Sequence, residues 1–264
     1  MRPFLALAAA GWRRWSAYRA ATVAGAFTNT VFGFVKAAIA MAAVASAGGV
    51  IVGYDARDVA TYSWLTQGLL AAMALFGWSE LAERVRTGDI AVDLARPTDL
   101  QLSWLAADLG RAAYVLLPRG LPPVLVGALT TGLSMPSSPL AYLLGSVSVA
   151  LGVSLSFAGR FLMNLAAFWL LDYRGVVTLY MLVSLVLSGL VIPVHWFPGW
   201  LGVLADLTFF PSILQTPVDV LSGRRQGTEA VGLLVVQGGW LVAVLLAGRL
   251  VLARATARLV VQGG

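Results

Sequence analysis

The chain has 264 residues, of which 59% are hydrophobic and 11% are charged, and its formal net charge is +6. Soluble globular domains have about a quarter of their residues charged, and no polar stretch here is long enough to form one. The composition therefore excludes a soluble fold and predicts an integral membrane protein. Cysteine is absent, which excludes disulfides and thiolate chemistry. The basic charges flank apolar segments, so membrane lipids, and not nucleic acid, are the expected anionic partner.

The N-terminal segment, residues 1–20, is basic and rich in tryptophan. Its apolar run is too long for a cleaved signal peptide, and no small-residue cleavage site ends it. We predict a retained helix that lies in the cytoplasmic membrane interface, with Trp and Arg side chains at the headgroup level.

Six apolar segments follow, and each predicts a transmembrane helix, because about 20 helical residues cross roughly 30 Å of hydrocarbon. The segments are 21–47, 59–78, 112–133, 140–159 (with apolar character continuing to 171), 176–194 and 230–252. The alternation typical of a membrane β-barrel is missing. The sequence therefore predicts an all-α, polytopic membrane protein, with residues 1–264 forming a single transmembrane domain.

The distribution of arginine predicts the orientation. The N-terminus, segment 79–111, the connection between the fourth and fifth segments, and the C-terminus together carry 13 arginines, whereas the opposite side carries Arg57, Arg224 and Arg225. Short cytoplasmic segments carry an excess of basic residues. Both termini and segment 79–111 are therefore expected to be cytoplasmic.

Residues 79–97 contain a cluster of acidic residues and arginines, which we call the charged island. Leu81 and Val85, and then Ile90 and Leu94, have helical spacing and give short apolar faces. Gly88 allows a turn between two short helices, and Pro97 ends the second one. We interpret the island as an elbow that inserts into a partner and transmits motion. The alternative is a solvated loop that only obeys the charge rule.

Segment 195–229 is external in this topology, yet it is aromatic, interrupted by proline and largely apolar. It is too short to span the membrane, so it predicts a re-entrant or interfacial hairpin whose backbone is covered by protein. It begins with His195, the chain's single histidine. Without cysteine or clustered carboxylates this residue is not expected to bind a metal.

Several polar residues fall within the apolar segments. Lys36 lies two helical turns after Asn29 and shares its face, so it either lines a cavity or reaches the interface or an acidic partner. Arg119 lies among prolines, which indicates either a hinge or a span that begins at Leu121. Arg160 and Asn164 are one turn apart, and we predict that they contact lipid phosphate.

Three glycines, Gly145, Gly152 and Gly159, recur every seven residues in the fourth segment. Small residues at this spacing lie on one face of a helix and allow close approach of another helix. They predict a packing face.

Two motifs carry a resemblance. Gly88-Asp89-Ile90 with Asp93-Leu94-Ala95-Arg96-Pro97 resembles the "Gly-x-Ile … Leu-x-(Arg)-Pro" element in permease subunits of type-2 ATP-binding-cassette exporters. The stretch from Ser188 to Pro217 is similar to that family's "Ser-Gly-x-x-x-Pro … Phe-Pro-x-Trp-Leu … Pro-Phe" signature, although Phe209-Phe210-Pro211 alters the local order. Phe168-Trp169 resembles the daunorubicin-resistance-like subfamily.

The resemblance implies a half-permease of the bacterial inner membrane that exports an apolar or amphipathic cargo. It would pair with a second half, identical or paralogous, and dock a cassette ATPase through the charged island, the family's coupling helix. The chain has no phosphate-binding loop, so no cofactor is expected in it, and ATP and Mg would bind to the partner ATPase subunits.

The resemblance also assigns residues. The ATPase-coupling residues would be Glu80, Glu83, Arg84, Arg86, Gly88, Asp89, Ile90, Asp93, Leu94, Arg96 and Pro97. The first, second and fifth segments would form the substrate route, with Phe27, Asn29, Phe32, Lys36, Tyr62 and Tyr180 as lining residues. The external re-entrant motif would comprise Gly189, Pro193, Phe197, Pro198, Trp200 and Pro211.

Two other functions fit the same apolar segments. A non-transporting scaffold or immunity protein would use them to recruit an ATPase partner. An intramembrane enzyme that acts on lipids would need paired catalytic groups at membrane depth, and the sequence supplies no such pair.

Overall fold

The computed structural model describes residues 2–76, 79–170 and 172–257, and in these ranges the chain is helical with no β-strand. This confirms the predicted all-α fold class. The elements in chain order are α1 (Arg2–Ser16), α2 (Arg19–Ser46), α3 (Ala56–Met73), α4 (Glu80–Thr87), α5 (Ile90–Leu94), α6 (Leu100–Val115), η1 (Leu116–Gly120), α7 (Leu121–Thr130), α8 (Pro139–Asn164), η2 (Leu165–Phe168), α9 (Arg174–Leu187), η3 (Val194–Trp196), α10 (Gly199–Asp206), α11 (Gln215–Leu221) and α12 (Gly227–Thr256).

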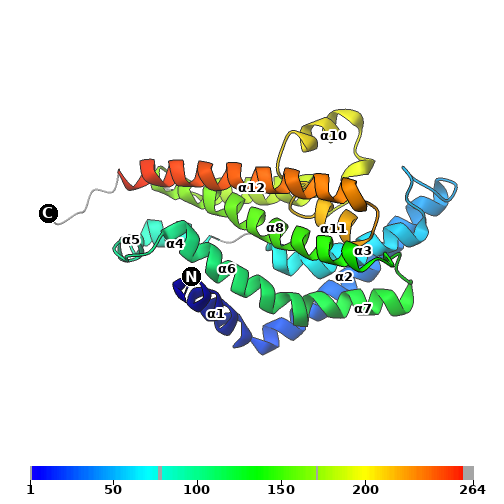
Figure 1. Cartoon of the computed structure of the whole chain (residues 1–264), viewed down its shortest axis with the longest axis horizontal. Helices are drawn as coiled ribbons and strands as arrows, with labels where there is room; N and C mark the ends of the chain where they lie inside the picture. The colour runs from blue at the N-terminus through cyan, green and yellow to red at the C-terminus, as the bar shows by residue number, and fades with distance from the viewer. Residues whose placement is uncertain (1, 77–78, 171, 258–264) are drawn as a thin grey trace.

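The bundle is elongated (Figure 1). The N-terminus, α4, α5 and the C-terminal end of α12 lie toward one end, and the loop between α2 and α3 lies at the other. The charged island, the start of α1 and the C-terminal end of α12 therefore lie toward the same end of the molecule, in agreement with the arginine distribution.

Within the described ranges, four helical segments are long and apolar enough to cross a membrane: Arg19–Ser46, Leu100–Thr130, Pro139–Phe168 and Gly227–Thr256. They correspond to the first, third, fourth and sixth predicted segments.

The second and fifth predicted segments form shorter helices. The second becomes α3, with 18 residues that are buried on nearly every side, and the fifth becomes α9, with 14 residues. The predicted limits at Trp78 and Leu171 lie outside the described residues. The count of six crossings therefore stays a prediction.

The third segment differs from its prediction at its start and at Arg119. We expected a helix from Ala112, but α6 begins at Leu100 and continues through η1 into α7. Residue 111 therefore does not mark the end of a segment. Asp108 and Arg111 pair with each other inside the bundle, so their charges do not interrupt the helix. The chain is also not broken at Arg119, because a single π-helical turn, η1, carries it through the proline-rich stretch.

The N-terminal helix forms as predicted, and one of its faces packs along α6. A Cβ atom added to Gly110 would lie 1.8 Å from the carbonyl oxygen of Ala8, and one added to Gly11 would lie 2.1 Å from that of Ala107. The two backbones are therefore in direct contact, and glycine is required at both crossings.

The predicted glycine face of α8 is confirmed as a packing face. A Cβ atom on Gly145 would meet the side chain of Leu221, one on Gly152 the carbonyl oxygen of Ile213, and one on Gly159 the Tyr180 hydroxyl. The glycines therefore admit α11, the turn before it and α9.

Replacing Gly110 with alanine is expected to destabilise the protein by about 1–3 kcal/mol, because the added methyl group overlaps the backbone of α1. Gly232→Ala on α12 is the matched control, since its Cβ position is open and alanine favours a helix by up to about 1 kcal/mol over glycine. Thermal unfolding of the two purified variants in the same detergent measures the difference. Equal stability of the two would contradict the close α1–α6 contact.

Candidate functional site

The charged island folds as predicted into two short helices, α4 and α5, with Gly88 between them. Gly88 has φ +84°, a left-handed conformation that glycine adopts without strain. The chain therefore reverses at Gly88 and presents a compact elbow at one end of the bundle.

The apolar face of the elbow points into the protein's own core. Leu81 and Ile90 are fully buried and belong to one cluster with Phe157, Phe161 and Leu165. The Asn164 side chain also accepts a hydrogen bond of 3.1 Å from the backbone N–H of Ala82. The apolar face is therefore not free for a partner, because α8 and η2 already cover it, and docking by the rest of the island stays a prediction.

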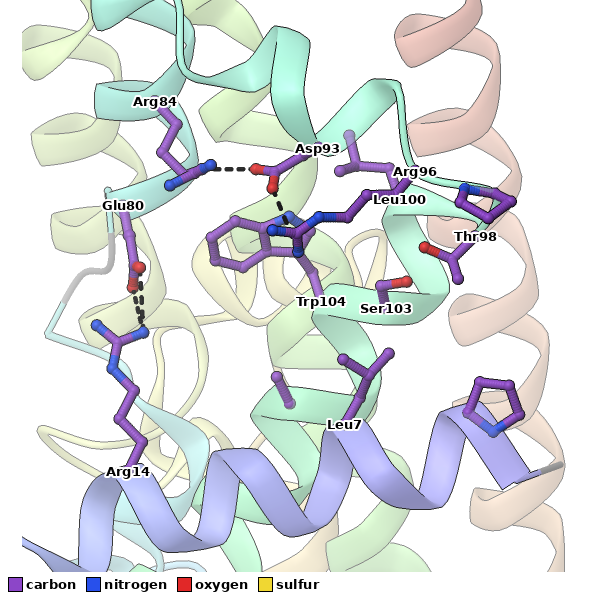
Figure 2. A pocket seen from close by; sticks show the side chains of 13 residues that line it. Leu7, Arg14, Glu80, Arg84, Asp93, Arg96, Thr98, Leu100, Ser103 and Trp104 are labelled. Atoms are coloured by element: carbon purple, nitrogen blue, oxygen red, sulfur yellow. Dashed lines mark hydrogen bonds and ion pairs between the residues drawn. The ribbon is translucent and has the colours of Figure 1, made fainter.

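Ion pairs fix the elbow to its surroundings (Figure 2). Asp93 is 8% exposed, and its carboxylate lies 2.5 Å from Arg84 and 3.7 Å from Arg96. Glu80 pairs with Arg14 of α1 at 3.1 Å. The N-terminal helix is thereby connected to the elbow across a cavity of about 490 Å³.

Another ion pair lies nearer the tip of the elbow. Arg86 pairs with Glu83 at 2.5 Å, and the Tyr173 hydroxyl donates to Glu83 at 3.0 Å. The hydrogen bonds from Arg86 and Tyr173 lower the pKa of the Glu83 carboxyl. Its negative charge therefore persists to a lower pH than that of an ordinary glutamate.

The elbow leaves one surface free. Of the predicted coupling residues, Arg86, Gly88, Asp89, Arg96 and Pro97 are exposed, Glu80, Glu83, Arg84 and Leu94 are half-buried, and Ile90 and Asp93 are buried. Val92, which the motif did not single out, is 58% exposed. We call the exposed residues 86–89, 91 and 92 the elbow tip. It combines charges of both signs with the exposed apolar side chains of Ala91 and Val92.

Four of the six predicted route residues line one cavity of about 680 Å³ between α2, α3 and residues 190–196: Asn29, Phe32, Lys36 and Tyr62. The Lys36 ammonium donates to the Thr66 hydroxyl at 2.7 Å and to the carbonyl oxygen of Leu190. The other two predicted residues do not line it. Phe27 is 71% exposed, and Tyr180 packs against Phe210.

The external segment is joined to Tyr62, a lining residue of this cavity, through Gln215, a buried residue that we did not predict. The Gln215 side-chain oxygen lies 2.7 Å from the Tyr62 hydroxyl and accepts a hydrogen bond of 2.9 Å from the Val194 backbone N–H. Gly189 has φ +86°, and an added Cβ would lie 2.5 Å from the Tyr62 hydroxyl. Both features explain why glycine stands at this position of the motif.

The remaining residues of the motif have different surroundings. Pro193 lines the cavity, Phe197 packs against the core, Pro198 precedes α10, and Trp200 is exposed. The Pro211 carbonyl accepts a hydrogen bond from the Thr216 N–H.

His195 lies 2.9 Å from Asp219, which also receives a hydrogen bond from Gln215. No group of metal-binding side chains occurs among the described residues. The histidine thus belongs to the hydrogen-bonded network that holds the hairpin on the bundle.

The sequence did not reveal a buried ionic cluster between α6 and α8. Asp108 lies 2.7 Å from Arg111 and 2.9 Å from Arg160, and all three side chains are less than a tenth exposed. Arg111 also donates to the backbone carbonyls of Ala71 and Ala72 at the end of α3. The prediction that Arg160 and Asn164 contact lipid phosphate is therefore wrong, because both are buried within the protein.

Asp108→Asn is expected to destabilise the protein by about 3–5 kcal/mol, because it leaves buried arginines without their carboxylate. Asp99→Asn is the matched control. Asp99 caps α6, which asparagine also does, and its pair with Arg249 is exposed, so its loss should cost less than about 1 kcal/mol. Thermal unfolding distinguishes the two, and a smaller effect at Asp108 than at Asp99 would contradict the ionic cluster.

A family model described as ABC-2 family transporter protein matches residues 31–263. The chain belongs to this family. The match begins within α2 and includes the elbow, Lys36 and the external motif. It confirms the ABC-2 part of the resemblance, and with the four apolar helices it identifies a multi-pass membrane subunit of an ATP-binding-cassette transporter, a class that works with ATPase partners. No curated protein and no solved structure matches the chain significantly.

Proposed function

We propose that this ABC-2 family protein is the permease half of an exporter in a bacterial inner membrane. It moves an apolar or amphipathic cargo and is driven by ATP hydrolysis on separate ATPase subunits, which also hold the ATP and Mg. A second permease half, identical or paralogous, completes the route. The observation that carries the proposal is an exposed elbow tip on a firmly anchored elbow. The Phe168-Trp169 pair supports the daunorubicin-resistance-like subfamily.

The elbow is suited to transmit force because its two sides differ. Its inner side is fixed by Leu81 and Ile90 in the core and by the buried Asp93 carboxylate, whereas its tip is free for a partner. Cores are close-packed and deform little. A push on the tip by a closing ATPase pair therefore moves α6 and α8 with it.

The proposed topology has six crossings and cytoplasmic termini. The chain would add α3 with the residues that follow it, and α9, to the four long helices, while α10 and α11 form the re-entrant hairpin. The buried position of α11 against α8 supports the hairpin, because backbone at membrane depth needs cover by protein.

A non-transporting scaffold is the second candidate, since it would use the same elbow. The cavity of about 680 Å³ favours transport. Its wall is mostly apolar but carries Asn29, Lys36 and Gln67, and polar groups at membrane depth indicate a substrate or ion pathway.

Exchanging the two charges of the Glu83–Arg86 pair, in the double variant Glu83→Arg with Arg86→Glu, is expected to abolish co-purification of the ATPase. The exchange retains an ion pair within α4 but inverts the charges that the partner meets. Affinity purification from membranes, with the ATPase quantified by immunoblot, measures the effect. The expected loss is at least about tenfold, as for charge pairs across an interface.

The matched control exchanges the Arg225–Glu229 pair, which is exposed at 3.2 Å near the start of α12. Arg225→Glu with Glu229→Arg should leave ATPase recovery unchanged, and both double variants should insert into the membrane normally. Undiminished recovery with the elbow variant would show that the partner docks elsewhere.

Single cysteines test the topology directly, because the natural chain has none. Thr87→Cys at the elbow tip and Thr228→Cys at the start of α12 are both exposed positions. A membrane-impermeant maleimide added to intact cells should label position 228 and spare position 87, with both labelled after permeabilisation. Labelling of position 87 in intact cells would contradict the cytoplasmic elbow.

A further inference from the structure

A second cavity adjoins the one that contains Lys36. We call the first the Lys36 cavity. The second, the Arg119 cavity, measures about 330 Å³ and lies among Trp15 of α1, α2, the end of α3, and arginines of α6, η1 and α8. Thr28, Asn29, Leu70 and Phe76 line both cavities. The two are therefore neighbouring chambers along the groove between α2 and α3.

Arg119 has no acidic partner in the described part of the chain, and its Nε atom is buried without a hydrogen bond. The π-helical turn η1 places it there, and Gly25 of α2 makes room for it, since an added Cβ would lie 2.4 Å from the guanidinium carbon. π-Helical turns of this kind often occur at functional sites. Arg119 thus presents an unpaired cation to the cavity.

The rest of the Arg119 cavity is also positively charged. Arg111 and Arg160 line it, and the one carboxylate that they share, Asp108, does not line it. The three arginines with Asp108 leave two formal positive charges in excess.

Lys36 is the cation of the other chamber. Its hydrogen-bond partners, the Thr66 hydroxyl and the Leu190 carbonyl, are neutral, and its ammonium lies 5.3 Å from the centre of the Tyr62 ring. No Asp or Glu is found among the described residues that line either cavity. Lys36 is 11 residues from Gly25 along the straight run of α2, a rise of about 16 Å.

We propose that the cargo is an amphipathic anion: an apolar chain with a phosphate or carboxylate head. The head binds first at Arg119 and then at Lys36, while the apolar chain contacts the largely apolar wall between α2 and residues 190–196. A cation at membrane depth raises the free energy unless a counter-charge is close to it. An anionic head supplies this counter-charge at each of the two positions. The same field repels a lipophilic cation.

This inference rests on the proposed function and names its substrate class. Its test uses the purified chain without an ATPase, in nanodiscs of phosphatidylcholine, so a failure of docking at the elbow leaves the result unaffected. The probe is radiolabelled dodecyl phosphate, and empty nanodiscs give the background. Two compounds serve as competitors. Dodecyltrimethylammonium has an apolar chain but the opposite charge, and inorganic phosphate has the negative charge but no apolar chain.

Dodecyl phosphate should bind saturably, and neither competitor should displace it at equal concentration. Lys36→Gln and Arg119→Gln should each weaken binding by about tenfold, the effect of one charge-assisted hydrogen bond. Lys36→Arg should retain binding, and Arg225→Gln, whose charge lies outside both cavities, should bind like the natural chain. Thermal unfolding of each variant checks that it is folded.

Phosphatidylglycerol added to the nanodiscs distinguishes the two sources of such an anion. Displacement of the probe supports a membrane lipid as the cargo, and no displacement supports a non-lipid amphiphile. Equal displacement by dodecyltrimethylammonium or by inorganic phosphate would overturn the proposal. So would unchanged binding in the folded double variant Lys36→Gln with Arg119→Gln.

Discussion

The arrangement of the bundle depends on one buried carboxylate. Asp108 of α6 neutralises Arg111 one turn later and reaches Arg160 of α8, so it joins two long helices inside the protein. Arg111 continues the connection to the carbonyls of Ala71 and Ala72, and Ser156 of α8 donates to the carbonyl of Met73. These are terminal carbonyls of α3 that have no partner within their own helix. One ionic cluster thus fixes the point at which α3, α6 and α8 meet.

That point lies between the two parts of the molecule to which we assign function. The segment after α3 leads to the elbow, and the residues before its end line the Lys36 cavity. α8 also contributes Phe157 and Phe161 to the core under Ile90. In the proposed transporter, movement of the elbow and a change at the cavity would therefore act on the same packed elements.

In the proposed route the cavities would give the permease a chemical preference as well as a path. An apolar wall alone would accept any lipophilic molecule, whereas Lys36 and Arg119, which have no acidic partner among the described residues, would discriminate by charge. The cost of leaving them unpaired makes a vacant route less favourable than one that holds an anion.

The sequence by itself determined the helical class, the four long apolar helices, the elbow with its turn at Gly88, and the glycine face of α8. These features follow from local patterns of hydropathy, charge and residue size, which a single helix already contains. Helical spacing placed Asn29 and Lys36 on one face, and the resemblance added Phe32 and Tyr62, which line the same cavity, and Phe27 and Tyr180, which do not.

Contacts between distant segments were decided only by the tertiary structure. Asp108 and Arg160 are 52 residues apart, so no local pattern shows that they pair with each other inside the bundle. The apolar face of the elbow looked like a docking surface because its cover, Phe157 and Phe161, lies on α8. Gln215 is one polar residue in an apolar stretch until folding brings it against Tyr62. A sequence states which groups need partners, but packing chooses the partners, since burial and hydrogen bonding depend on segments that meet only in the folded chain.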